Sequence, residues 1–253
     1  MRIAYATVGH GPSLLRPATW MTHLEHDWES PVWRHWIRSL SRDFCLIRHD
    51  ERANGLSDWE VDDVSFEALA RDLDAVVAAT GLRHFPLLGI SQGCAVAYTV
   101  RHPDRVSHLV LCGSYAAGWA TGGTPEEASK RTALATLTRH GRGQDNPAFR
   151  QVFTSLFIPD ARPEQMQWFN DLQGVTVSPE NAFRLQHVFS GIEIRPLLAE
   201  VQAPTLVLHS RHDCVVPFEQ ERLLASGIPG RASSRLKAAI IFRWKKNPPG
   251  CDF

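Results

Sequence analysis

The chain has 253 residues, 43% of them hydrophobic, with 27 basic and 27 acidic side chains. That length and apolar content suffice for one domain with a sizeable core and an inserted subdomain. The balanced charge argues against a nucleic-acid partner, and the lack of any apolar run of about 20 residues argues against a membrane span.

Short apolar runs that end in turn residues are typical of buried parallel strands. The chain contains such runs at Phe44–Arg48, Phe85–Leu88, Leu109–Cys112 and Thr205–His209. Helical periodicity fills the intervals between them. This alternation predicts an α/β fold in which a mostly parallel sheet carries helices on both faces.

The clearest helix signal lies between the first two predicted strands. Apolar residues recur there at three- and four-residue steps, and Thr80-Gly81 then provides a helix stop. The residues on this apolar face are Phe66, Leu69, Ala70, Leu73, Val76 and Val77. The pattern predicts an amphipathic helix.

From about Tyr115 to Arg195, strand-like runs become rare, aromatic residues lie in helical-looking segments, and prolines punctuate the chain. We interpret this segment as a helical cap inserted into the sheet domain. Residues 1–114 are then the N-terminal part of the core, 115–195 the cap, and 196–253 the C-terminal part of the core.

The strongest functional signal is Gly89-Ile90-Ser91-Gln92-Gly93, which follows a predicted strand and precedes a helical stretch. In that context G-x-S-x-G is typical of a nucleophile elbow, a turn so tight that glycines flank the serine. The turn exposes the Ser91 hydroxyl on a strained backbone, and the next helix directs N–H groups toward developing negative charge. The alternative is a chance occurrence of this pattern on a surface turn.

A second segment, Leu206–Asp213, combines a buried strand with a loop that carries an aspartate. In folds with such an elbow, the acid follows a late strand, after the serine, and orients the base histidine. We predict this role for Asp213. The alternative role is to cap the helix that follows Pro217.

Taken in order, these segments resemble the α/β-hydrolase superfamily over residues 2–230, and most of all the hydrolase-like domains found beside nucleotide-cyclase or DNA-binding regulatory domains. The family's D-x-R-G-x-G-x-S loop, which is structural in relatives, is matched here with Ala53 in place of its first glycine. Besides the elbow, the resemblance rests on Arg2–Thr7, Trp28–Trp36, Asp50–Asp58 and Pro204–Pro217.

The resemblance also implies an oxyanion hole. Ala18-Thr19-Trp20 stands where many relatives have His-Gly, so by similarity the backbone amides of Trp20 and Gln92 would hold the oxyanion. The helix after the elbow is about two residues shorter than in relatives, which turns its faces by roughly 200°. We therefore expect strain in that helix.

The chain lacks the histidine that this chemistry needs. All 12 histidines lie at or before His212, whereas the chain order of the fold places the base after the acid. Nothing in the spacing of His209, His212, His23 or His26 recommends them as replacements. We interpret His209 as a strand-end residue and His23 as a structural hydrogen-bonding group.

The resemblance also ends near Gly230, because residues 230–239 lack the expected apolar strand. A shift of reading frame there explains both losses. One back-translation of Arg231–Ile241, read from its third base, gives Arg-Phe-Val-Pro-Leu-Glu-Gly-Arg-Asn-His, an apolar strand followed by a histidine. We therefore expect a truncated or frame-shifted C-terminus after about residue 230.

These features predict a serine hydrolase that acts on an ester or related acyl substrate and is impaired by the missing base. The predicted partner is a small molecule, and the chemistry implies no metal or organic cofactor. One alternative is a non-catalytic sensor or regulatory domain, whose Trp- and Phe-rich cap closes over a small apolar ligand. Another is a degraded product that folds poorly because its last strand and covering helix are missing.

Cysteine usage and the N-terminus bear on location. The segment Met1–Thr7 lacks the apolar core of a secretory signal. An odd number of scattered cysteines, without metal-ligand spacing, is typical of free thiols in a reducing cytoplasm. These cysteines are Cys45, Cys94, Cys112, Cys214 and Cys251. We expect a cytoplasmic protein.

Overall fold

The computed structural model describes residues 1–144, 146–230 and 232–236. Over these residues the strands form one seven-stranded sheet, in the order β1-β3-β2-β4-β5-β6-β7. The β1 strand runs antiparallel to β3, and the other neighbours are parallel. The strands are β1 (Tyr5–Val8), β2 (Ser13–Arg16), β3 (Cys45–His49), β4 (Phe85–Ile90), β5 (Val106–Cys112), β6 (Thr205–Ser210) and β7 (Ala232–Leu236).

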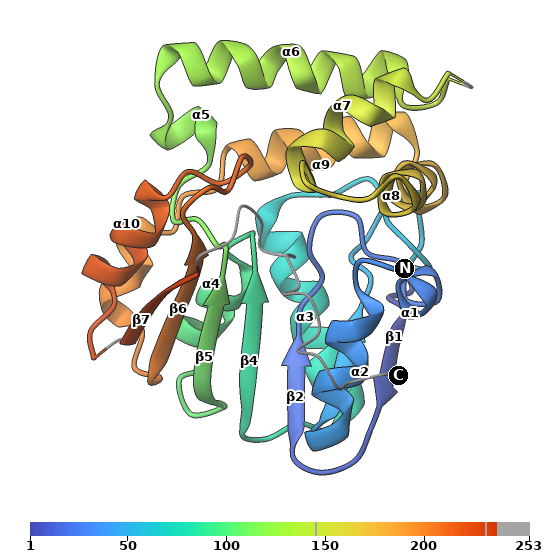
Figure 1. Ribbon diagram of the computed structural model, residues 1–253. Helices are drawn as coiled ribbons and strands as arrows, with labels where there is room; N and C mark the ends of the chain where they lie inside the picture. Colours follow the sequence, from blue (N-terminus) through green and yellow to red (C-terminus); the bar gives the residue numbers. More distant parts are fainter. Residues whose placement is uncertain (145, 231, 237–253) are drawn as a thin grey trace, which may run out of the picture.

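From β2 to β5, helices separate successive strands, and the consecutive helices α5 to α9 separate β5 from β6 (Figure 1). The helices of the core are α1 (His26–Glu29), α2 (Arg34–Asp43), α3 (Phe66–Thr80), α4 (Cys94–Arg101), the 3₁₀ helix η1 (Arg195–Glu200) and α10 (Glu219–Gly227). The others are α5 (Trp119–Gly122), α6 (Pro125–Gly141), α7 (Ala148–Phe157), α8 (Pro163–Thr176) and α9 (Pro179–Ser190).

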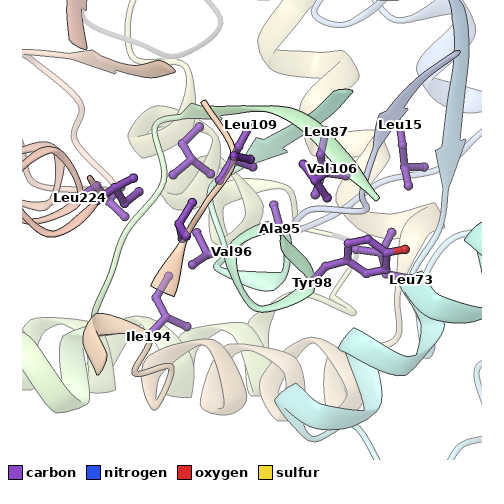
Figure 2. Packing of buried hydrophobic residues seen from close by; sticks show 14 of the residues in the cluster. Leu15, Leu73, Leu87, Ala95, Val96, Tyr98, Val106, Leu109, Ile194 and Leu224 are labelled. Atoms are coloured by element: carbon purple, nitrogen blue, oxygen red, sulfur yellow. The ribbon is translucent and has the colours of Figure 1, made fainter. Parts of the chain in front are cut away.

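Helices cover both faces of the sheet, as predicted. Because successive strand residues point to opposite faces, Leu15 and Leu87 belong to one core with residues of α3, α4 and α10, such as Leu73, Ala95 and Leu224 (Figure 2). Their neighbours Leu14 and Leu88 belong to a second core with α2 and α8. The four predicted strands are present as β3, β4, β5 and β6.

The predicted helix between the first two of these strands is α3. Its N-terminus is capped by the Ser65 hydroxyl, which accepts a hydrogen bond from the Ala68 amide at 3.2 Å. It ends at Gly81, whose φ of 67° is left-handed. Its apolar face packs into the first core. The predicted helix stop at Thr80-Gly81 is therefore confirmed.

The helix after the elbow, in which we expect strain, is α4. This helix is continuous from Cys94 to Arg101, and each residue from Cys94 to Thr99 is buried. The sheet lies on one side of it, and α3 and η1 pack on other sides. Because α4 is enclosed all round, a rotation of its faces leaves no apolar side chain in water.

The expectation that no strand follows Gly230 is wrong for the backbone. Residues Ala232–Leu236 form β7, which pairs in parallel with β6 in the register Leu206 to Ala232. The outer edge of β6 carries backbone groups that need partners, and the last strand of a sheet does not require an apolar sequence. The predicted change of frame concerns residues that, from 237 onward, lie outside the described part.

The helices α5 to α9 form an insertion that lies over the carboxyl ends of the parallel strands (Figure 1). We call residues 119–190 the helical insertion. Within the described ranges, no helix combines the length and apolarity needed to traverse a bilayer. The cysteines Cys45, Cys94, Cys112 and Cys214 are free thiols, and Cys251 lies outside the described residues.

Candidate active site

Ser91 lies on the turn between β4 and α4, with a φ of 65° in the left-handed region. Two backbone hydrogen bonds hold this turn against the end of β5. The Ser91 amide donates to the Cys112 carbonyl at 3.2 Å, and the Tyr115 amide donates to the Ser91 carbonyl at 3.2 Å. The predicted elbow therefore has the strained backbone expected of it.

The glycines on either side of Ser91 permit close packing. A Cβ atom on Gly89 would lie 2.6 Å from the Ala95 Cβ, and one on Gly93 would lie 2.8 Å from the Ile194 Cδ1. Real Cβ atoms do not approach so closely, so a larger residue would force α4 or the Ile194 side chain to move. The pattern G-x-S-x-G thus has a packing cause at both glycines.

Strand register brings Ser91 and the loop of Asp213 to the same edge of the sheet. Ile90 pairs with Cys112, and Cys112 pairs with Leu208, so β4, β5 and β6 end side by side. Ser91 directly follows β4, and Asp213 follows β6 after a short turn. Strands separated by one neighbour lie roughly 10 Å apart. The end of β5 lies between the two side chains.

Asp213 is fixed by its own loop. Its Oδ1 accepts hydrogen bonds from the Val215 and Val216 amides, each at 2.8 Å. Its Oδ2 is buried and has no hydrogen-bond partner among the described residues. Burial raises the pKa of Asp213, and the two amides oppose that rise. The alternative of a helix cap is wrong, because the Asp213 Oδ1 binds residues that precede α10, whose N-cap is Phe218.

A cavity of about 150 Å³ opens beside Ser91, between the strand ends and the helical insertion. Its wall also contains Val215 and Val216, whose amides bind Asp213. The polar wall residues include Glu127, Arg131 and others of the insertion. The aromatic wall residues are Trp20, Tyr115, Trp119, Phe153, Phe157 and Phe189. The cavity suits an apolar group next to the hydroxyl.

Arg131 of α6 connects the helical insertion to residues 211–216, the loop that carries Asp213 and that we call the acid loop. Its Nη2 donates a hydrogen bond to the Val215 carbonyl. Burial lowers the pKa of Arg131, whereas the charges of Glu127 and Asp213 raise it. No local sequence pattern predicts this contact, because 84 residues separate its partners.

One of the two predicted oxyanion donors lies at the same cavity. Trp20 lines it beside Ser91, and Met21, the next residue, has a left-handed φ of 59°. Within the described residues, neither the Trp20 amide nor the Gln92 amide is hydrogen-bonded to a backbone carbonyl. The Gln92 side chain donates to the Ala18 carbonyl and to a carboxylate oxygen of Glu51. Sequence reasoning missed Glu51, which it treated as part of a structural loop.

None of the described histidines lines the cavity. The His209 ring is fully buried, with its Nε2 3.0 Å from the Val216 carbonyl, so it lies behind the acid loop. The His23 Nδ1 accepts a hydrogen bond from the His26 amide at 3.2 Å. Both contacts agree with the structural roles expected from the sequence.

The loop after β3 has structural contacts as well. The Asp50 Oδ2 accepts from the Leu24 and Leu56 amides at 3.1 and 2.9 Å. Arg52 forms a buried ion pair with Asp72 at 2.6 Å. Ala53, which replaces the family's glycine, has a left-handed φ of 64°. The glycine pattern therefore marks a backbone need that alanine meets here with strain.

A sequence profile of the alpha/beta hydrolase fold matches residues 26–238. The chain belongs to the alpha/beta hydrolase family. It is 25% identical to the AB hydrolase superfamily protein YisY of Bacillus subtilis (strain 168), over 87% of this chain and 81% of that protein. It is 22% identical to the pyrrolizixenacetamide deacetylase of Xenorhabdus hominickii, over 93% of this chain and 86% of that protein.

Solved structures of this family share the fold. The enol-lactonase from Burkholderia xenovorans LB400 is similar to this chain with a TM-score of 0.76 and 22% sequence identity. The similarity covers 94% of this chain and 89% of that one. The α/β fold, the mostly parallel sheet and the family resemblance expected from the sequence are therefore confirmed.

Proposed function

We propose that this chain is a serine hydrolase of esters or related acyl compounds, with Ser91 as its nucleophile. The observation that carries the proposal is the left-handed elbow of Ser91, which opens into an apolar cavity at the sheet edge that also holds the Asp213 loop. The names of a similar deacetylase and a similar enol-lactonase agree with acyl chemistry.

In this mechanism the Ser91 Oγ attacks the substrate carbonyl carbon and loses its proton to a base. The carbonyl oxygen becomes an oxyanion, which accepts hydrogen bonds from the Trp20 and Gln92 amides. Collapse of this intermediate expels the protonated alcohol and leaves an ester on Ser91. Attack by water then releases the acid and restores the hydroxyl.

The base is the weak point of this chain. In a complete triad the imidazole N–H donates to the acid, and the unpartnered Oδ2 of Asp213 is the acceptor available for it. No histidine follows Asp213 in the sequence. Proton transfer from Ser91 then falls to solvent, so catalysis keeps only substrate binding and oxyanion stabilisation.

The proposal extends to the surroundings of Ser91. The helical insertion acts as a cap, and its aromatic wall residues receive an apolar acyl or aromatic group of a small-molecule substrate. With the connecting residues on either side of the helical insertion, the proposed cap spans residues 115–195. A reducing cytoplasm is the proposed location, in agreement with the free thiols.

A fluorophosphonate carrying a fluorescent label tests the nucleophile directly. We expect slow labelling of the intact chain, located to Ser91 by peptide mass spectrometry, and none in the Ser91→Ala variant. Ser114→Ala is the matched control, because Ser114 is a buried serine near the same strand ends that does not line the cavity. Equal labelling of the intact chain and Ser91→Ala would contradict the proposal.

The second candidate is a ligand-binding sensor. It is favoured by the same cavity together with the absence of any histidine from its described wall. Saturable binding of an aromatic or acyl ligand by calorimetry, without labelling of Ser91, would support this candidate. Labelling of Ser91 with turnover of an ester would reject it.

A further inference from the structure

The side chain of Gln92 joins the two segments that carry the proposed oxyanion donors. Its Nε2 donates to the Ala18 carbonyl at 3.3 Å and to the Glu51 Oε2 at 2.9 Å. The backbone amide of Gln92 is one proposed donor, and Ala18 lies two residues before Trp20, the other. A single side chain therefore fixes the distance between the elbow and residues 18–21, which we call the Trp20 loop.

We propose that Gln92 and Glu51 are positioning residues that hold the two halves of the oxyanion hole in register. The inference rests on the proposed function, since it assigns a purpose to contacts at the same site. Hydrogen bonds to an oxyanion depend on donors placed within a few tenths of an ångström. The Trp20 loop needs such support, because Met21 holds a left-handed φ of 59°.

Both positioning residues are enclosed by protein. Glu51 is 2% exposed and Gln92 is 5% exposed, so neither hydrogen bond competes with bulk water. Glu51 lies between Asp50 and Arg52 on the loop after β3. Hydrogen bonds from the Leu56 amide to Asp50 and from Arg52 to Asp72 hold this loop in place. Glu51 is thus an acceptor in a fixed position. Because the same Gln92 nitrogen donates to Glu51 and to Ala18, the position of Glu51 also restrains Ala18.

A neutral Glu51 carboxyl suits a position beside the proposed oxyanion hole. Burial raises its pKa to about 8, the hydrogen bond from Gln92 opposes this rise, and the charges of Asp72 and Asp50 add to it. Burial also raises the pKa of Cys94 and of Tyr115, and the charge that Glu51 carries when it is ionised adds to that rise. A neutral carboxyl accepts from Gln92 without placing a negative charge behind the oxyanion.

The experiment compares three variants by their rate of fluorophosphonate labelling at pH 7. Gln92→Leu removes the donor and Glu51→Leu removes the acceptor, so we expect each to slow labelling about 10- to 100-fold, short of the loss of a whole oxyanion donor. Glu51→Gln keeps an acceptor oxygen, and we expect it to restore the rate to within about threefold of the natural chain.

A control and a second measurement separate positioning from stability. Gln173→Leu is the matched control, because the buried Gln173 also donates two hydrogen bonds from Nε2, to the Arg150 carbonyl and the Thr154 hydroxyl, both at 3.0 Å. It should lose stability but label at the normal rate. With 5-fluorotryptophan incorporated, the ¹⁹F signal of Trp20, assigned by Trp20→Phe, should broaden or split in Gln92→Leu and Glu51→Leu only.

The outcomes are distinct. Normal labelling and an unchanged Trp20 signal in both leucine variants would overturn the positioning role, and so would Glu51→Gln labelling as slowly as Glu51→Leu. If the natural chain labels no faster than Ser91→Ala, the proposed function fails. The Trp20 signal then decides alone whether Gln92 and Glu51 hold the loop.

Discussion

At the scale of single residues, the backbone of the candidate site and its surroundings is strained at three positions. Ser91, Met21 and Ala53 each carry a side chain at a left-handed φ, which costs roughly 1–2 kcal/mol per residue. Two of the three belong to the segments that form the proposed oxyanion hole. Such strain persists only where neighbouring contacts enforce it, here the backbone bonds of Ser91 to Cys112 and Tyr115.

The strain at Ser91 is measurable in a pair of variants. Ser91→Gly and Ser91→Ala both remove the hydroxyl, but only glycine relieves the left-handed strain of its φ of 65°. We expect Ser91→Gly to be more stable than Ser91→Ala by about 1 kcal/mol in urea unfolding. A less stable glycine variant would show that the elbow is unstrained.

Glu51 predicts a pH dependence of stability. Its folded pKa is about 8 against an ordinary value of 4.5, so between these values the folded chain binds a proton that the unfolded chain has lost. Its contribution to stability is complete below about pH 4.5 and falls as the pH rises toward 8. Relative to the natural chain, Glu51→Gln should therefore gain roughly 3–5 kcal/mol between pH 5 and pH 9. Urea unfolding at both pH values measures this gain, and a constant difference would contradict it.

Single residues also show which parts of the candidate site can be predicted from the sequence. The position of Ser91 and Asp213 at one edge of the sheet could be predicted, because each follows a recognisable buried strand and the fold brings strand ends together. The partnership of Glu51 and Gln92 could not, because 41 residues separate them and neither carries a local pattern. Long-range polar pairs of this kind depend on how segments pack, not on local sequence.

At the scale of elements, periodicity predicts the helices and strands that have one apolar face. The helix α3 begins at the Ser65 cap and ends at Gly81 because both signals agree with its apolar stripe. The strand β7 was missed because its sequence is polar and only pairing with β6 defines it. The register of a neighbouring strand is a tertiary signal that a short segment does not contain.

Gly118, directly before the helical insertion, and Gly174 within it give opposite predictions. A Cβ on Gly118 would lie 2.2 Å from the Ser190 carbonyl, whereas one on Gly174, in α8, meets nothing within 4 Å. Gly118→Ala should therefore lower the melting temperature, because the chain after β5 must move away from α9. Gly174→Ala should raise stability by about 1 kcal/mol through helix propensity. Thermal unfolding of both decides, and equal effects would contradict the packing account.

At the scale of the whole molecule, the sheet and the helical insertion together form the cavity. The sequence predicts an inserted helical segment from its composition, but the cavity walls come from residues as distant as Trp20 and Val216. The contact of Arg131 with the acid loop likewise depends on how the insertion sits on the sheet. These residues come together because of their positions in the folded chain and share no sequence motif.

The most direct test of the central claim is the rate of p-nitrophenyl ester hydrolysis by this chain and by a version whose residues from 231 onward follow the shifted reading frame, which supplies a histidine after Asp213. If Ser91 and Asp213 are a nucleophile and an acid without a base, the restored version should turn over ester at least about 10³ times faster. Ser91→Ala in the restored version should remove that gain. Equal rates for the two chains would contradict the account.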